Sequence, residues 1–145
     1  MKLSRTVFYA VQATLRLAEA ESTRPMPCSK LAAAGKMPER FLLQILRHMV
    51  THGILHSTRG VEGGYALGRS PDKISLLDIM EAIEGPLDTS LPEGIHGSPE
   101  QDAILRKALG RVACAAREQM AAIKLSDLAV RPNQRARDQP NSPNV

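Results

Sequence analysis

Few residues in this sequence have side chains suited to covalent or metal chemistry, and their spacing disfavours most such uses. The two cysteines, Cys28 and Cys114, lie far apart, without a CxxC pair or a histidine at ligand spacing. This arrangement predicts neither a zinc site nor a disulfide framework. Three histidines follow one another every four residues, at His48, His52 and His56, but the predicted helix ends before the third. No nucleophile, base and orienting group come together in the pattern, so an enzyme is not expected.

The glycine-rich stretch RGVEGGY, residues 59–65, raises the question of a phosphate-binding loop. A P-loop needs GxxxxGK followed by Ser or Thr, and a dinucleotide-binding loop needs GxGxxG, each between a strand and a helix. The stretch matches neither pattern and leads into a strand-like run, so it is predicted to be the turn of a β-hairpin. Two interpretations stay open. One is a plain hairpin; the other is a wing whose glycines approach DNA closely while Arg59 enters a minor groove.

Helical periodicity predicts three helices in the first part of the chain. Apolar side chains recur at spacings of three and four along residues 4–20, with Ser4 as the N-cap. Residues 28–36 are expected to form a short helix that Gly35 closes. A third helix is expected over residues 38–53. Two short helices joined by a tight turn are typical of a helix-turn-helix.

The predicted hairpin, residues 54–67, follows the helix-turn-helix directly. Helix, helix-turn-helix and hairpin in that order describe a winged helix-turn-helix, a mainly α fold with a small β-hairpin. A fourth helix is predicted over residues 75–85, because Ser75 and Asp78 have the spacing of a capping box.

One long helix is predicted over residues 100–124, followed by a half-turn that Ser126 caps. Its apolar residues offer more surface than so small a domain covers alone, which favours pairing with a second copy of the chain. The last residues are rich in Pro, Asn and Arg and lack apolar periodicity. The expected division is a winged helix-turn-helix DNA-binding domain over 1–86, a loop over 87–99, a long dimerisation helix with a short terminal helix over 100–130, and a disordered tail over 131–145.

Charge is unevenly distributed along the chain. Residues 1–60 carry nine Lys/Arg against three Asp/Glu, whereas residues 61–110 carry four against nine. A basic front part suits a domain that meets a polyanion, of which nucleic acid is the commonest. No apolar run approaches the roughly 20 residues that a bilayer span needs, and the N-terminus lacks the pattern of a signal peptide. A cytoplasmic protein without membrane contact is therefore expected.

A winged helix-turn-helix would place the start of the third helix in the major groove. There Gln44 could pair with adenine and Arg40 with guanine or a phosphate, while an exposed Leu43 could press on a thymine methyl. The alternatives are that Gln44 has no partner and that Leu43 covers a neighbouring side chain. The predicted DNA-binding residues are Ser4, Arg5, Pro38, Glu39, Arg40, Leu43, Gln44, Arg47, Ser57, Arg59, Gly60, Val61, Gly63 and Tyr65.

Three segments of the sequence resemble one known family. They are MKLSRTVFYAVQATLRLA at the start, the run from GKMPERFLLQ through the RGVEGGY wing to SLLDIMEAIEGP, and the closing LSDLAV. In these segments the chain resembles the Rrf2 family of bacterial winged-helix transcriptional regulators. The resemblance implies a homodimer, crossed through the long helix, that binds a palindromic operator in double-stranded DNA and acts as a repressor. Family members often carry an acidic residue where this chain has Leu43, which implies a different operator preference.

Cluster-binding members of the family carry three cysteines between the fourth helix and the long helix. That spacing falls on Pro92, Ser98 and Ile104 in this chain, and none of these residues binds iron as a thiolate does. The rarer ligand set, a carboxylate in the first helix and a histidine in the second, falls near Phe8 and Ala33. Neither an iron–sulfur cluster nor another cofactor is therefore expected.

The cysteines leave a regulatory alternative open. Cys28 opens the second helix, where the helix dipole is expected to lower the pKa of its thiol and Lys30 lies nearby, so it is a candidate redox thiol. An idle cysteine is the alternative, and Cys114 is predicted to pack in the core. Three functions remain: a cluster-free DNA-binding regulator controlled by a small-molecule effector or a regulatory protein, a redox-sensing regulator acting through Cys28, and a protein-interaction module on a winged-helix scaffold.

Overall fold

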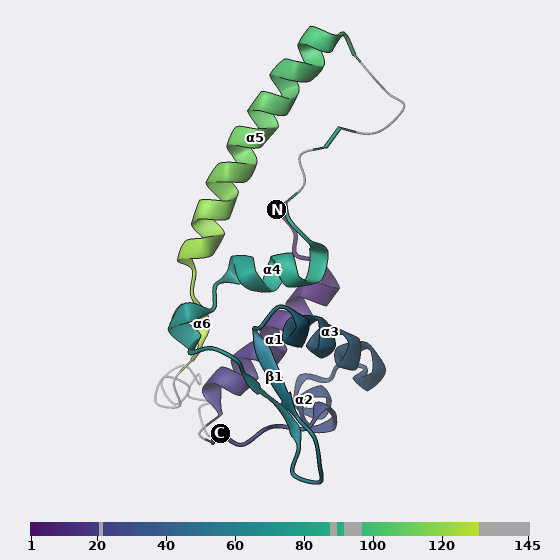
Figure 1. The fold of residues 1–145 in the computed structure, drawn as a ribbon, viewed down its shortest axis with the longest axis vertical. Coiled ribbons are helices and arrows are strands. Elements are labelled where there is room, and N and C mark those ends of the chain that lie inside the picture. The colour runs from purple at the N-terminus through teal and green to yellow at the C-terminus, as the bar shows by residue number, and fades with distance from the viewer. Residues whose placement is uncertain (21, 88–89, 92–96, 131–145) are drawn as a thin grey trace, which may run out of the picture.

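The computed structural model describes residues 1–20, 22–87, 90–91 and 97–130, so the predicted tail over 131–145 lies outside the described residues. Three helices come first and a hairpin follows: α1 (Arg5–Glu19), α2 (Cys28–Gly35), α3 (Glu39–Thr51), β1 (Leu55–Thr58) and β2 (Gly64–Leu67). The remaining elements are the 3₁₀ helix η1 (Pro71–Lys73) and the helices α4 (Leu76–Glu84), α5 (Pro99–Ala122) and α6 (Leu125–Leu128) (Figure 1). This confirms the predicted fold, mainly helical with a small hairpin and a long late helix.

Helix α1 lies at the centre of the fold and contacts α2, α3, α4 and α6. Ser4 caps it as predicted, because its Oγ accepts a hydrogen bond from the Val7 N–H at 3.2 Å. The inward face of α1 is apolar except for the fully buried Thr14. The Thr14 hydroxyl donates to the Ala10 carbonyl at 2.6 Å, so its burial leaves no donor unsatisfied.

The turn between α2 and α3 differs from the prediction. The residue in the left-handed conformation is Lys36, with φ of 51°, and its N–H bonds back to the last turn of α2. Gly35 still belongs to the helix, and a Cβ there would require the end of the Met37 side chain to move. The end of α3 agrees with the prediction, because Gly53 follows it with φ of 70°.

The wing is an antiparallel pair of strands with an additional contact at one edge. Thr58 of β1 pairs with Gly64 of β2 beside the turn. Met26, just before α2, exchanges two backbone hydrogen bonds of 2.9 Å with Tyr65 of β2. Gly64 permits this approach, because its φ is 151° and a Cβ there would collide with the backbone of Met26. The segment before α2 is thereby anchored to the wing.

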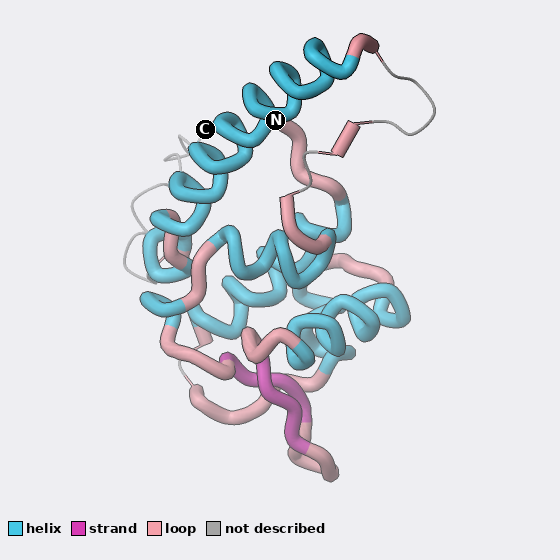
Figure 2. The backbone as a smooth tube through the Cα atoms, turned by 45° about the horizontal axis from the view of Figure 1, so that its top comes forward, coloured by secondary structure: helices cyan, strands magenta, loops and turns pink. Residues whose placement is uncertain are grey.

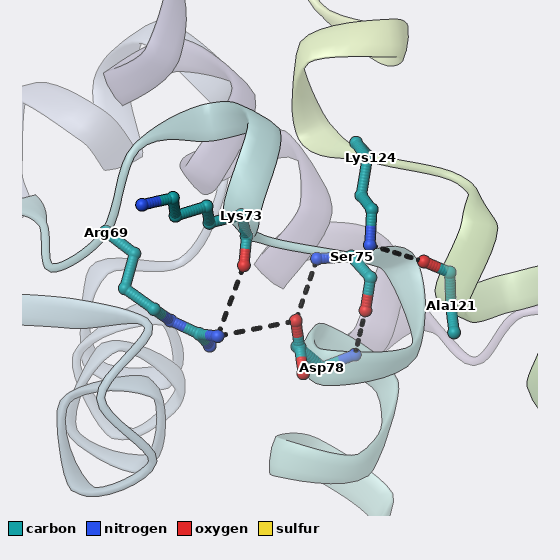
Figure 3. Close-up of polar contacts among 6 residues, drawn as sticks. All are labelled: Arg69, Lys73, Ser75, Asp78, Ala121 and Lys124. Carbon is teal, nitrogen blue, oxygen red and sulfur yellow. Dashed lines mark hydrogen bonds and ion pairs between the residues drawn. The ribbon is translucent and has the colours of Figure 1, made fainter.

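The start of α4 is held by the predicted capping box (Figure 3). Ser75 Oγ accepts a hydrogen bond from the Asp78 N–H at 3.0 Å, and Asp78 Oδ2 accepts one from the Ser75 N–H at 2.8 Å. Arg69, just after the wing, adds an ion pair to Asp78 at 3.6 Å and a hydrogen bond to the Lys73 carbonyl at 3.2 Å. These contacts connect the end of the wing with the start of α4.

The chain returns to this junction after α5. The Leu76 N–H donates to the Ile123 carbonyl at 2.9 Å, and the Leu125 N–H donates to the Ile74 carbonyl at 2.8 Å. Leu125 is buried in the same hydrophobic core as the winged helices. The residues after α5 are therefore part of the packed body of the protein.

Two helix ends near the C-terminus differ from the predictions. Helix α5 begins one residue earlier than predicted, because Ser98 is its N-cap and accepts a hydrogen bond from the Gln101 N–H at 3.2 Å. Ser126 lies inside α6 and does not cap it. Lys124 is at the N-cap position, where its N–H donates to the Asp127 carboxylate at 2.8 Å. A carboxylate that reaches back from the third helical residue replaces the predicted serine cap.

Helix α5 projects from the packed body (Figures 1 and 2). Only Met120, near its end, is buried. Three large apolar side chains are exposed, Ile104 at 70%, Leu105 at 47% and Val112 at 66%. Cys114 is exposed as well, so the prediction that it packs in the core is wrong. The reason is that most of α5 has no core beside it in the single chain.

Candidate nucleic-acid interface

Helix α3 separates its side chains into a buried and an exposed face. Its inward face buries Leu42, Ile45, Leu46 and Met49, which fixes the orientation of the helix. The opposite face is exposed at Glu39, Arg40, Gln44 and Arg47, and Pro38 at the N-cap position is exposed too. The structure therefore brings the predicted major-groove residues together on one accessible helix face, with the single exception of Leu43.

Leu43 is half-buried, so the expectation of an exposed leucine is wrong. Each residue turns an α-helix by about 100°, which places Leu43 on the outward side of α3, between Glu39 and Arg47. Its accessible part lies next to the face that Gln44 occupies. Covering a neighbouring side chain and pressing on a base both remain compatible with this position.

The start of α1 lies beside the exposed face of α3. Thr6 of α1 lines a groove of about 100 Å³ together with Gln44 and His48 of α3. Arg5 is exposed, whereas Ser4 is half-buried and its hydroxyl already accepts the capping hydrogen bond. Arg5 is therefore available for an external contact next to α3, and the side chain of Ser4 primarily holds the helix start in place.

The wing turn carries an exposed cation at the far end of the hairpin. Arg59 and Gly60 are exposed and Val61 is fully exposed. Gly60 has φ of 112°, and its carbonyl accepts a hydrogen bond from the Gly63 N–H at 3.0 Å. A Cβ at Gly63 would collide with the Thr58 carbonyl. Both glycines are thus required by a tight turn that presents Arg59 to solvent.

Ser57 and Tyr65 pair with each other across the two strands. Ser57 is exposed, but Tyr65 is half-buried and packs against the hydrophobic core. Tyr65 therefore supports the wing from within, and only its accessible part is available to a ligand.

Sequence reasoning missed Arg24. This residue is exposed and lines a groove of about 300 Å³ together with Glu62 and Gly63 of the wing turn. No motif or periodicity marks Arg24. Its position depends on the pairing of Met26 with Tyr65, and these two residues are far apart in the sequence. Its charge was the available signal, since it lies in the basic first third of the chain.

Cys28 is the first residue of α2 and is half-buried. Its Sγ lies 3.7 Å from the Glu39 carbonyl oxygen, to which the thiol donates a weak hydrogen bond. Burial, and then the negative charge of Glu39, raise the pKa of the Cys28 thiol. The expected lowering of this pKa is therefore wrong, because desolvation disfavours the thiolate. A smaller thiolate fraction weakens the case for a redox sensor at Cys28.

The described residues do not fit an iron–sulfur cluster. Of the three positions where relatives carry cysteines, Ser98 caps α5, Ile104 lies on its exposed surface, and Pro92 lies outside the described residues. The cysteines are on separate helices, Cys28 on α2 and Cys114 on α5. Within the described part of the chain, no three His, Cys, Asp or Glu side chains are grouped so that they could hold a metal ion.

Comparison with known proteins places this geometry in a family. The model of the Rrf2 family, described as "Iron-dependent Transcriptional regulator", matches residues 3–131. The chain belongs to the Rrf2 family. As an Rrf2 protein it has the family's fold, and its described residues contain no group of three His, Cys, Asp or Glu that could hold the iron of that description.

Individual Rrf2 relatives agree with this assignment. A Mycobacterium tuberculosis protein named as an HTH-type transcriptional regulator is 38% identical over 99 residues, which cover 68% of this chain and 62% of that protein. This chain thus spans less than two thirds of that relative. The HTH-type transcriptional regulator CymR of Bacillus subtilis is 28% identical over 129 residues, 89% of this chain and 90% of CymR.

A solved structure supports the same conclusion. The structure of CymR, the global cysteine regulator of B. subtilis, matches with a TM-score of 0.70 at 26% identity, covering 89% of this chain and 96% of that chain. The matching family and these relatives are transcriptional regulators and not enzymes, which agrees with the expectation that the chain is a regulator and not an enzyme. Among the described residues, no helix combines the length and the hydrophobicity needed to cross a membrane.

Proposed function

We propose that this Rrf2 protein is a homodimeric repressor that binds a palindromic operator without an iron–sulfur cluster. The observation that carries the proposal is the accessible surface of α3, flanked by the exposed Arg5 at the start of α1 and followed in the chain by the wing with Arg59. A helix of this kind fits the major groove, and a wing that carries arginine fits the adjacent minor groove.

Three exposed side chains of α3 divide the work of recognition in this proposal. Gln44 hydrogen-bonds an adenine edge, and Arg40 contacts a guanine or a phosphate near the start of the helix. Arg47, about one turn after Gln44 on the same exposed face, binds a backbone phosphate. The side chain of Leu43 is partly accessible and has no hydrogen-bonding group, so in this proposal it contributes by contact with a thymine methyl.

The dimer in this proposal forms through α5. Ile104, Leu105 and Val112 are exposed on a helix that has no core beside it, and a second copy would remove this apolar surface from water. Two-fold symmetry then gives each dimer two copies of α3, and the matching DNA site is a palindrome with one half-site per copy.

The signal that controls DNA binding is, in this proposal, not read by a cluster. A cluster needs about four ligands, mostly thiolates, and the only cysteines of a dimer would be two copies each of Cys28 and Cys114. We place the protein in the cytoplasm and assign its control to a small-molecule effector or a regulatory protein. The similarity to CymR, the global cysteine regulator of B. subtilis, supports this choice of signal class.

Two other functions compete with this proposal. A redox regulator acting through Cys28 needs a reactive thiolate, and the raised pKa of Cys28 opposes it. A protein-interaction module on the same scaffold needs no cations on the wing, yet Arg59 is exposed there.

The experiment that tests the proposal is selection of operator sequences from fragmented genomic DNA, followed by affinity measurements on the enriched sites. We expect enrichment of inverted repeats and an affinity that falls steeply with salt concentration. Light scattering should give a dimer at micromolar protein concentration. Absence of any enriched sequence would support the interaction module, and a monomer that binds single half-sites would contradict the dimer.

A further inference from the structure

Arg24 lies on the segment between α1 and α2, which passes the wing close to its turn (Figure 1). Its backbone is held on both sides. The Arg24 N–H donates to Ser22 Oγ at 3.1 Å, and two residues later Met26 exchanges two hydrogen bonds of 2.9 Å with Tyr65. Pro25 between them restricts the backbone further. The segment thus forms a short additional edge of the wing sheet, with Arg24 at a defined place beside it.

The side chain of Arg24 lines a groove beside the wing turn. It is exposed, and the groove of about 300 Å³ that it lines is completed by Pro25, Pro27, Glu62 and Gly63. Arg24 makes no ion pair with any residue that the structure describes. A guanidinium beside the wing turn that makes no ion pair with a described residue is available to an external anion, and its planar shape suits a phosphate.

The position of Arg24 relative to Arg59 indicates which anion this is. Arg59 is on the wing turn itself, whereas Arg24 is on the segment that flanks the hairpin. The minor groove is only about 6 Å wide, so a hairpin tip that enters it has the phosphates of both strands along its flanks. Arg24 is then on the side of the wing where one of these phosphate rows passes.

We propose that Arg24 is a second DNA contact of the wing, which binds a backbone phosphate beside the minor groove that Arg59 enters. The inference rests on the proposed function and adds to it a residue that positions the wing without reading bases. A phosphate contact carries no direct sequence information. Arg24 therefore strengthens binding to operator and to other DNA by a similar factor.

Glu62 provides the competing explanation. Its carboxylate lines the same groove, so Arg24 could act only by offsetting the repulsion between Glu62 and the DNA phosphates. The two explanations differ in one respect. Replacing Glu62 with a neutral residue removes its repulsion of the DNA phosphates, so Arg24 would no longer have a repulsion to offset. A direct contact between Arg24 and a phosphate would remain.

The test measures operator affinity against KCl concentration for the full chain and five variants. These are Arg24→Gln, Arg24→Lys, Glu62→Gln, the double variant Arg24→Gln/Glu62→Gln, and Arg106→Gln as a control. Arg106 is exposed on α5, so its replacement makes the same charge change away from the wing. Circular dichroism and light scattering verify that every variant keeps the fold and oligomeric state of the wild type.

Each phosphate contact contributes about 0.9 to the slope of log affinity against log salt concentration. With one Arg24 in each subunit, Arg24→Gln should lower the slope by about 1.8, whether residue 62 is Glu or Gln. At fixed salt, affinity should fall about 3- to 30-fold on operator and on unrelated DNA alike. Arg24→Lys should retain most of the slope, because it keeps the charge, and Arg106→Gln should change it by less than half as much.

An unchanged slope for Arg24→Gln overturns the inference, and so does an effect that disappears in the Glu62→Gln background. A loss confined to the operator would also contradict it, since that result would assign base reading to Arg24. A failure of the proposed function would give a different result, because the wild-type protein itself would then show no preference for operator DNA.

Discussion

The wing and the free part of α5 both project from the packed body, at opposite ends of the molecule (Figure 2), but they are held in place by different means. The wing is fixed within the chain, by strand pairing, a closed turn at Gly60 and the two hydrogen bonds between Met26 and Tyr65. Helix α5 leaves Ile104 and Val112 exposed, and no residue of the described part of the chain covers them. The comparison teaches that the shape of the wing is set within the chain, whereas the exposed apolar surface of α5 would be covered only in the proposed dimer.

The largest effect should come from a charge in the exposed apolar surface of α5. Val112→Glu should dissociate the proposed dimer, because an unpaired buried carboxylate costs about 3 kcal/mol or more, equivalent to about 100-fold in the dimer dissociation constant. Operator affinity should fall with it. Light scattering and operator titration measure both. Gln119→Glu is the matched control, since it adds the same charge at an exposed polar position of α5, and a variant at Val112 that stays dimeric would contradict the proposed interface.

The next effect concerns the tip of the wing. Arg59→Ala should weaken operator binding by about 1 to 3 kcal/mol, because it removes a charged contact made close to the DNA. Val61→Ala, in the same turn and fully exposed, is the control and should have little effect on affinity. Fluorescence anisotropy at fixed salt gives the comparison. Unchanged affinity of Arg59→Ala would show that the wing turn does not touch DNA.

An effect on stability, and not on DNA affinity, tests how the wing is held. Gly64→Ala should lower the free energy of unfolding by about 2 to 4 kcal/mol, because the new Cβ collides with the Met26 backbone. Gly53→Ala is the control. It also has a positive φ, but a Cβ there meets nothing within 4 Å, so about 1 kcal/mol is expected. Urea unfolding measures both, and equal losses would mean that the Met26 contact is not important for the fold.

The smallest effect concerns Cys28. Because burial and Glu39 raise the pKa of its thiol, less thiolate is present at neutral pH than for an ordinary thiol. In a Cys114→Ser background, iodoacetamide should therefore label Cys28 a few-fold more slowly than it labels glutathione at pH 7, with the rate increasing into a higher pH range. Glu39→Gln should raise the rate modestly, since it removes the second cause of the shift. Labelling of Cys28 faster than glutathione would restore the redox hypothesis.

Local signals made much of the fold predictable from the sequence. Ser4, Ser75 and Asp78 have cap chemistry that works within one helical turn, and Gly60 and Gly63 mark a tight turn by their conformational needs. Such features depend on neighbours in the chain, so a sequence pattern contains them.

Properties that depend on distant residues were not predictable in this way. Arg24 was missed because its place is set by the pairing of Met26 with Tyr65. The pKa of Cys28 was predicted in the wrong direction because the fold buries the thiol and places Glu39, from another helix, near it. Cys114 was expected in the core because it lies among alanines on a predicted helix. Those neighbours do not reveal whether another element covers that part of the helix, and in the structure Cys114 is exposed.

The central claim is that the protein binds its operator as a dimer and does not need an iron–sulfur cluster to do so. The most direct test purifies the protein anaerobically, divides one sample between iron and sulfide analysis and operator titration, and compares the two results. We expect iron and sulfide far below one per chain, no visible absorbance, and tight binding of one dimer per palindrome. Near-stoichiometric iron and sulfide, with visible absorbance that is lost in Cys28→Ser together with operator binding, would contradict the account and would assign Cys28 and Cys114 to a cluster shared between subunits.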